Sequence, residues 1–162
     1  MALADDLLTL AGQLSNPTAK DPQQAWLRRS VSTAYYALFQ LLVQQASQRW
    51  TGSATSQIGL QRTFKHNQME EACQLVANGS WAGWSTPRLG VPPELQDLAK
   101  LFVRLQEARH QADYNNEKSW TRTEVATKLH EARTAFRNWK LIDGTSVAEE
   151  FLLSLMIGKR RE

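Results

Sequence analysis

The chain has 162 residues, of which 42% are apolar and 22% charged, as is usual for one soluble globular domain with a buried core. Its 19 basic and 16 acidic residues leave a formal charge of +3, which permits nucleic-acid binding without indicating it. A single cysteine, Cys73, excludes an intramolecular disulfide, and no apolar run approaches the roughly 20 residues that cross a bilayer, so we expect a cytoplasmic protein with no membrane partner.

The first half of the chain predicts three helices. Residues 2–14 form a short amphipathic helix with leucines on one side, and Ser15, Asn16 and Pro17 end it. A much longer helix runs from about Pro22 to Trp50, and its middle is apolar nearly all round, as expected of a central helix with several neighbours. After a Gly/Ser/Thr linker, a third helix covers about residues 60–77.

The second half predicts three more helices. A Gly- and Pro-rich loop precedes a helix over residues 93–113, and a capping box of Thr121 and Glu124 begins the next one. The last helix, residues 146–157, has an apolar face that either docks on its own bundle or makes a dimer or partner contact.

No strand pattern is present, so the predicted fold class is all-α. We expect an up-and-down antiparallel helical bundle of four to five helices plus a short C-terminal helix. The chain is predicted to be one domain, residues 1–162, with a bundle core over about residues 22–141.

The helix at 93–113 carries an arginine where its apolar seam should continue. Steps of three and four residues connect Leu95, Leu98, Phe102, Leu105, Arg109 and Ala112. A guanidinium on a buried stripe requires partners, and Asp113, one turn later, is the nearest candidate. The pair is either a structural ion pair or the sign of a functional site.

We hypothesise that Arg109 and Asp113 share a polar pocket with one or both of Tyr35 and Tyr36 and with His66. The alternative is that both tyrosines are core residues whose hydroxyls are satisfied locally.

Two further groups of side chains are candidates for nucleic-acid contact. Trp81 and Trp84, supported by Arg88, offer faces on which bases can stack, or else they fold back over the helix ends. A second, basic group lies on one face of the helix that follows Thr121, where a solvated charged face is the alternative explanation. Its members are Arg133, Arg137 and Lys140.

Two stretches together resemble a known family. One contains Arg28, Ser30, Ala34, Tyr35, Tyr36, Ala37 and Phe39, and the other contains Arg109, Ala112, Asp113 and Tyr114. They resemble the HEPN superfamily of prokaryotic helical bundles, in particular an uncharacterised subgroup with an A-Y-Y-A stretch and a later R-x-x-A-D-Y. His66 falls at a helix start where that subgroup carries Lys or His.

The resemblance implies a homodimeric bundle, often encoded with a nucleotidyltransferase-like partner in toxin-antitoxin or phage-defence systems. Active members are metal-independent ribonucleases, in which an R-x(4–6)-H motif places Arg against the scissile phosphate and His for proton transfer.

This chain departs from that motif. The positions where the histidine should follow Arg109 hold Tyr114, Asn115 and Asn116. Arg104 and His110 match formally, but six residues on a straight helix point the two side chains about 120° apart.

We therefore expect a catalytically degenerate module that binds RNA or a nucleotidyltransferase-like antitoxin. The alternative is a ribonuclease toxin in which Arg104 or Arg109 binds phosphate and His110 or His66 moves the proton. No cofactor or metal site is expected.

Overall fold

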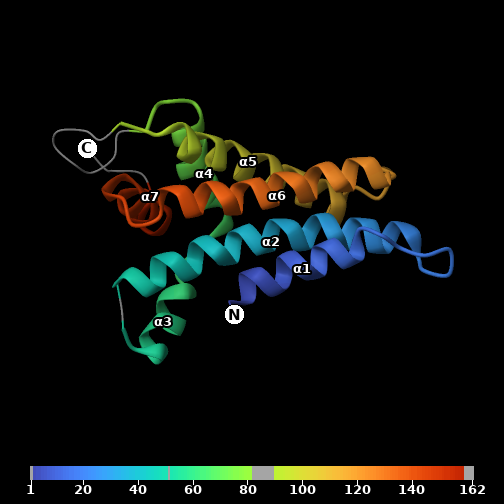
Figure 1. The fold of residues 1–162 in the computed structure, drawn as a ribbon, viewed down its shortest axis with the longest axis horizontal. Coiled ribbons are helices and arrows are strands. Elements are labelled where there is room, and N and C mark those ends of the chain that lie inside the picture. Colours follow the sequence, from blue (N-terminus) through green and yellow to red (C-terminus); the bar gives the residue numbers. More distant parts are fainter. Residues whose placement is uncertain (1, 51, 82–89, 159–162) are drawn as a thin grey trace. The chain divides into compact units, whose positions relative to one another are not determined.

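The computed structural model describes residues 2–50, 52–81 and 90–158, and all regular secondary structure in these ranges is helical (Figure 1). In chain order the helices are α1 (Leu3–Leu14), α2 (Gln23–Trp50), α3 (Ala54–Gln61), α4 (His66–Ala77), α5 (Pro93–Tyr114), α6 (Arg122–Ile142) and α7 (Ser146–Ile157). The predicted fold class, an all-α helical bundle with a short C-terminal helix, is confirmed. Among the described helices, none combines the length and apolar character that a membrane span requires.

One predicted helix is in fact two. The expected single helix at 60–77 is replaced by α3 and α4, and the presumed linker before it forms most of α3. Ser53 explains the early start, because its side chain accepts the Ser56 N–H at 3.4 Å and caps the helix. Residues 62–65 separate the two helices, and Phe64 among them is buried.

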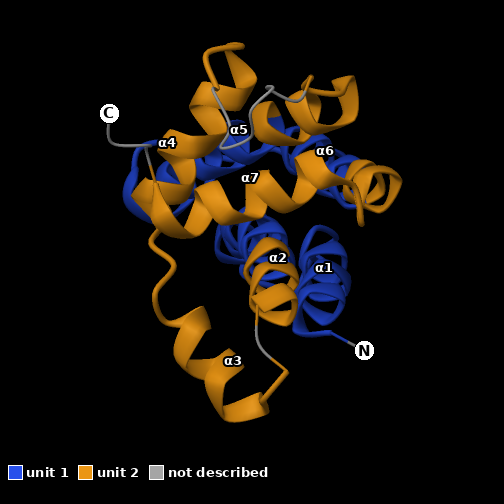
Figure 2. Ribbon diagram, turned by 90° about the vertical axis from the view of Figure 1, so that its left-hand side faces the viewer, with its two compact units in different colours: residues 1–41, 101–136 blue, residues 42–100, 137–162 orange. Residues whose placement is uncertain are grey.

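The chain divides into two compact units, which are coloured separately in Figure 2. Unit 1 comprises residues 1–41 and 101–136, and unit 2 comprises residues 42–100 and 137–162. The boundary between the units falls inside helices α2, α5 and α6, so each of these helices has one part in unit 1 and another part in unit 2. Each unit is therefore assembled from parts of the sequence that lie far apart.

In unit 1, the most deeply buried residues of α1 are small ones, while Leu7, Leu8 and Leu14 are half-buried. Ala4 and Ala11 are fully buried, whereas Leu3 is 50% exposed and Leu10 is 42% exposed. The hydroxyl of Ser30, on α2, donates to the carbonyl of Ala11 at 2.7 Å. Close approach of the two helices at Ala11 determines which face of α1 is buried.

The core of unit 1 is built around the first part of α2. Its residues 31–39 are all buried except Tyr36, which is half-buried, as expected for the central helix. A cluster of buried side chains contains residues of α2, α5, α6 and the loop between α5 and α6. Its members are Leu27, Val31, Ala108, Ala112, Trp120 and Val125.

In unit 2, α7 packs against α4. Phe151, Leu152 and Leu155 of α7 are fully buried, and the side-chain amide of Gln68 donates to the Met156 carbonyl at 2.8 Å. The apolar face of α7 is thus buried within the chain itself, which confirms the first of the two alternatives for this helix.

Candidate functional site

The two stretches that carry the family resemblance meet in unit 1. Arg28, on α2, donates from its guanidinium to the carbonyls of Ala112 at 3.0 Å, Asn115 at 2.9 Å and Asn116 at 3.4 Å. It also donates to the Lys118 carbonyl. The last carbonyls of a helix have no hydrogen-bond partner within the helix. A cation placed there caps α5 and interacts favourably with the negative end of its dipole.

Arg109 lies inside the seam of α5, as predicted. Its side chain is only 12% exposed, and its Nη1 atom is 3.8 Å from the Asp113 carboxylate. The guanidinium carbon is 5.2 Å from the centre of the Tyr35 ring and 5.9 Å from that of Tyr36. Its Nε donor is buried and finds no acceptor among the described residues. Contact with the two aromatic rings therefore contributes much of what holds this charge.

Asp113 connects the same cluster back to α2. Its carboxylate accepts the Ser32 hydroxyl at 3.2 Å. Tyr35 is fully buried, with its ring 5.3 Å from Tyr36 and 5.5 Å from Phe102. The structure thus brings Arg109, Asp113, Tyr35 and Tyr36 together, as hypothesised.

Arg104 and His110 occupy different surroundings on α5. Both are exposed, and the His110 ring lies 5.0 Å from the ring of Tyr114, which is 65% exposed. Arg104 instead lines a pocket against α6. Tyr114 therefore packs against His110 on the exposed side of α5.

The remaining predicted residues are distributed over both units. His66 is the first residue of α4, in unit 2, and Trp84 and Arg88 lie outside the described residues. Arg133 is exposed on the unit 1 part of α6, and Arg137 and Lys140 are exposed on its unit 2 part.

Trp81 is used inside unit 2. Its indole N–H donates to the Ser154 hydroxyl of α7 at 3.1 Å, and its ring is half-buried. This contact favours the alternative in which Trp81 folds back over the helices rather than offering a free stacking face.

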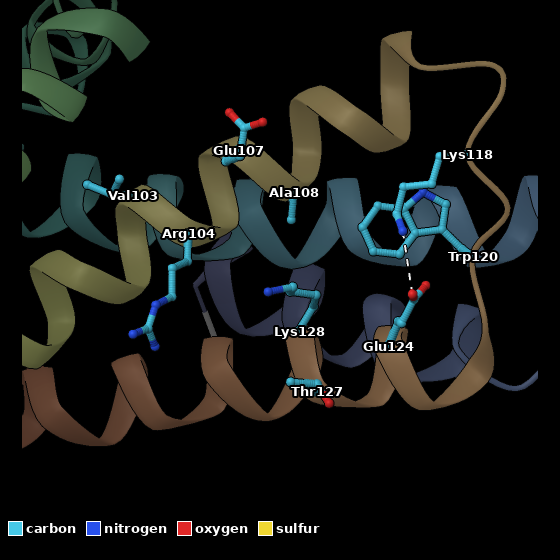
Figure 3. A pocket seen from close by; sticks show the side chains of 9 residues that line it. All are labelled: Val103, Arg104, Glu107, Ala108, Lys118, Trp120, Glu124, Thr127 and Lys128. Atoms are coloured by element: carbon cyan, nitrogen blue, oxygen red, sulfur yellow. Dashed lines mark hydrogen bonds and ion pairs between the residues drawn. The ribbon is translucent and has the colours of Figure 1, made fainter.

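A pocket between α5 and α6 was not anticipated from the sequence. Its volume is about 610 Å³, and it lies within unit 1 (Figure 3). It is lined by Val103, Arg104, Glu107, Ala108, Lys118, Trp120, Glu124, Thr127 and Lys128. Figure 3 shows Arg104 reaching from α5 toward α6, while Glu107 points to the other side of α5.

The far end of this pocket is ordered by the capping box at the start of α6. Thr121 and Glu124 bond reciprocally, with the Thr121 N–H donating to the carboxylate at 3.1 Å. That hydrogen bond and the Lys118 ammonium, 3.4 Å away, lower the pKa of Glu124. Lys118 also lies 4.6 Å from the centre of the Trp120 ring.

The capping box was visible in the sequence, but the pocket was not. Lys118, Trp120 and Lys128 have unremarkable spacing, and only the packing of α5 on α6 brings them together with Arg104. In the described part of the chain, no three His, Cys, Asp or Glu side chains gather as metal ligands would.

Comparison of the chain with protein-family models, with curated protein sequences and with solved structures finds no match. Any assignment of function therefore depends on the residues themselves and on the motifs that they form.

Proposed function

We propose that the chain is a HEPN-like module of a prokaryotic toxin-antitoxin or phage-defence type system that acts by binding RNA without cleaving it. The observation that carries the proposal is the position of Arg109. The arginine of the R-x-x-A-D-Y stretch is enclosed by Asp113 and two tyrosine rings. Its guanidinium is enclosed where α2 meets α5, and only 12% of the side chain is exposed.

The formal Arg104 and His110 pair gives little support for cleavage. Metal-independent cleavage needs a proton-transfer group within reach of the phosphate that the arginine holds. Here the His110 ring packs at an angle against the Tyr114 ring, while Arg104 lines the pocket against α6. The two side chains leave α5 in different directions, as the helical spacing predicted.

RNA is favoured over a protein partner by the chemistry of the α5–α6 pocket. The pocket contains the Trp120 indole and three cationic side chains, of which Lys118 and Lys128 are paired with carboxylates and Arg104 is not. Cations and aromatic rings in one groove are typical of proteins that bind single-stranded nucleic acid. A nucleotidyltransferase-like partner is the alternative outcome of the test.

The test is a binding and cleavage assay with labelled single-stranded RNA in the presence of a chelator. We expect RNA to be bound and to stay intact, with affinity that falls as salt rises. If Arg104, the cation of the pocket without a carboxylate partner, contacts one phosphate, Arg104→Gln reduces the slope of log affinity against log salt concentration by about 0.7 in magnitude. Arg29→Gln is the matched control, because Arg29 is exposed on α2 and does not line the pocket.

Two results would overturn the proposal. Cleavage that Arg104→Gln or His110→Ala abolishes would establish the ribonuclease alternative. Absence of RNA binding at low salt would instead favour recognition of a protein such as a nucleotidyltransferase-like antitoxin.

We also propose that the module is a homodimer, as the family resemblance implies. The exposed leucines of α1, Leu3 and Leu10, are apolar surface that a second copy can cover. Light scattering after size exclusion should give twice the chain mass, and replacement of both leucines by Ser should reduce it. A monomeric mass for the unaltered chain at high concentration would refute the dimer.

A further inference from the structure

A second pocket lies between α1 and α6, within unit 1. Its volume is about 530 Å³, inside the range of about 300–1,000 Å³ that is usual for small-molecule sites. Its wall on α6 is formed by residues at steps of four, three and four, namely Arg122, Ala126, Leu129 and Arg133. At about 100° per residue they share one face of α6, opposite the face that carries Glu124, Thr127 and Lys128. This α1–α6 pocket is therefore separate from the α5–α6 pocket.

The charged side chains that line the α1–α6 pocket are all positive. Its described lining contains two arginines and no Asp or Glu. Glu131, the acidic residue of α6 closest in sequence to Arg133, pairs instead with Lys128 at 3.4 Å. A pocket that presents two guanidinium groups without a carboxylate favours an anionic ligand.

The two arginines differ in what they contact. Arg122 donates to the carbonyl of Pro17, which follows α1. Arg133 makes no hydrogen bond or ion pair with any described residue. Its Nη2 atom lies 3.1 Å from the position that a Cβ atom on Gly12 would occupy. Glycine is less favourable than alanine inside a helix, and in α1 it leaves room for this guanidinium beside the backbone.

The surface between the two arginines is small and apolar. Ala126 and Leu129 lie between them on the same face of α6, and Leu129 is buried, with its Cδ2 atom 3.9 Å from the Cβ position of Gly12. The Cα atoms of Arg122 and Arg133 are separated by about 16 Å along the helix axis. Two anionic groups joined by an apolar spacer match this arrangement better than one compact anion does.

The end of α1 adds an ordered polar rim without adding negative charge. The Ser15 hydroxyl donates to the Gly12 carbonyl at 2.7 Å and accepts the side-chain amide of Asn16 at 3.3 Å. An amide nitrogen carries two hydrogens, so Asn16 retains a second N–H that can donate to a ligand. Asn16 itself is exposed. The rim therefore also favours a ligand that accepts hydrogen bonds.

We propose that the α1–α6 pocket binds a small linear dicarboxylate. One carboxylate pairs with Arg133 and the other with Arg122, while the methylene chain lies against Ala126 and Leu129. A planar guanidinium can pair with a carboxylate through two parallel N–H···O bonds, which gives the site its chemical preference. The inference does not rest on the proposed RNA binding, because that binding uses the opposite face of α6.

The first experiment titrates the whole chain, at constant ionic strength, with adipate and with hexanoate, which has the same carbon chain but one carboxylate. Binding is followed by the ¹⁵N–¹H signal of the Gly12 backbone amide, identified by its loss in Gly12→Ala. We expect adipate to move this signal and hexanoate to bind about tenfold more weakly. No movement with adipate at about 20 mM, or equal binding of hexanoate, would overturn the proposal.

Inorganic phosphate and AMP test the preference for two carboxylates. Both should bind more weakly than adipate, because each carries its charge on a single phosphate group. Tighter binding of either ligand than of adipate at this pocket would show that the site is built for phosphate, and the dicarboxylate proposal would then be wrong.

Variants of the pocket separate charge from size. Arg133→Gln should make adipate bind no more tightly than hexanoate, and Arg29→Gln, on an exposed residue of α2, should change neither ligand. Ala126→Glu places a carboxylate between the two arginines and should lower the affinity for adipate about tenfold, whereas Ala126→Gln, of nearly equal size, should lower it less. Ala126 is exposed, and Glu and Gln are both good helix formers, so both variants are expected to fold. Equal effects of Glu and Gln, or unchanged adipate binding in Arg133→Gln, would contradict the proposal.

The RNA-binding assay distinguishes this inference from the proposed function. If RNA binds and adipate does not, the dicarboxylate inference fails and the proposed function stands. If adipate binds and RNA does not, the reverse holds.

Discussion

Removal of the Arg28 guanidinium should be among the most damaging single changes in unit 1. Four carbonyls at the end of α5 and in the loop after it accept from this group. Those of Asn115 and Asn116 are exposed, so water can replace the lost bonds. The bonds to Ala112 and Lys118 are part-buried, and two charge-assisted bonds at about 1.5 kcal/mol each give a loss of about 3 kcal/mol for Arg28→Met.

The assay is equilibrium unfolding in urea. With a slope of about 2 kcal/mol per molar, a loss of about 3 kcal/mol lowers the midpoint by about 1.5 M. Arg28→Lys should fall between wild type and Arg28→Met, because one ammonium cannot span four carbonyls. Arg29→Met is the control at an exposed neighbour on the same helix. A loss below about 1 kcal/mol for Arg28→Met, or an equal loss in the control, would refute the capping argument.

Three other predictions test the polar cluster, the buried thiol and the capping box. Arg109→Met should change the free energy of unfolding by less than about 1 kcal/mol. The loss of a 3.8 Å ion pair and two ring contacts is offset by the removal of a buried N–H that has no acceptor. A urea titration that gives a loss above about 3 kcal/mol would contradict this prediction. Burial raises the pKa of the Cys73 thiol, so a thiol reagent at pH 8 should label it only as fast as the protein unfolds, and rapid labelling of the native chain would be inconsistent with its burial. The bond from the Thr121 N–H lowers the pKa of Glu124 below its usual value of 4.5, so its contribution to stability is present above that pH and is lost as the pH falls through the folded-state pKa. Unfolding midpoints of wild type and Glu124→Gln should therefore converge below about pH 4, and a constant difference from pH 7 to pH 3 would argue against this linkage.

Most of the fold was predictable because its helices carry local signals. The capping box at Thr121 and Glu124 and the breaks after Leu14, Trp50 and Tyr114 are features of a few neighbouring residues, and the structure shows each of them. The start of α3 was missed because a Ser cap within a Gly/Ser/Thr stretch looks like a linker when it is read by composition.

The buried face of α1 was harder to predict. Its leucines form the obvious apolar stripe, yet Ala4 and Ala11 face the core. Close packing on α2 selects small side chains, and helical periodicity alone does not reveal how closely a partner helix approaches. Leu3 and Leu10 remain at the surface as a consequence.

The candidate site was predictable only where its residues are close in sequence. Arg109 and Asp113 are one helical turn apart, so their pairing follows from helix geometry. Arg28 reaches carbonyls 84 to 90 residues away, and its target is backbone, which leaves no pattern in the sequence. The α5–α6 pocket likewise depends on how two helices pack and on a loop between them.

The placement of Arg109 also restricts how a ribonuclease version of this module would have to work, even as a dimer. To meet a phosphate, its guanidinium would have to leave two tyrosine rings, each contact being worth about 0.5–2 kcal/mol. Asp113 would then lose its cationic neighbour beside α2. Arg104 faces no such penalty, because it is exposed and unpaired among the described side chains. Of the two arginines of α5, Arg104 is therefore the one that an RNA phosphate would reach more readily under the proposed function, and substitutions there, more than at Arg109, would discriminate between binding and cleavage.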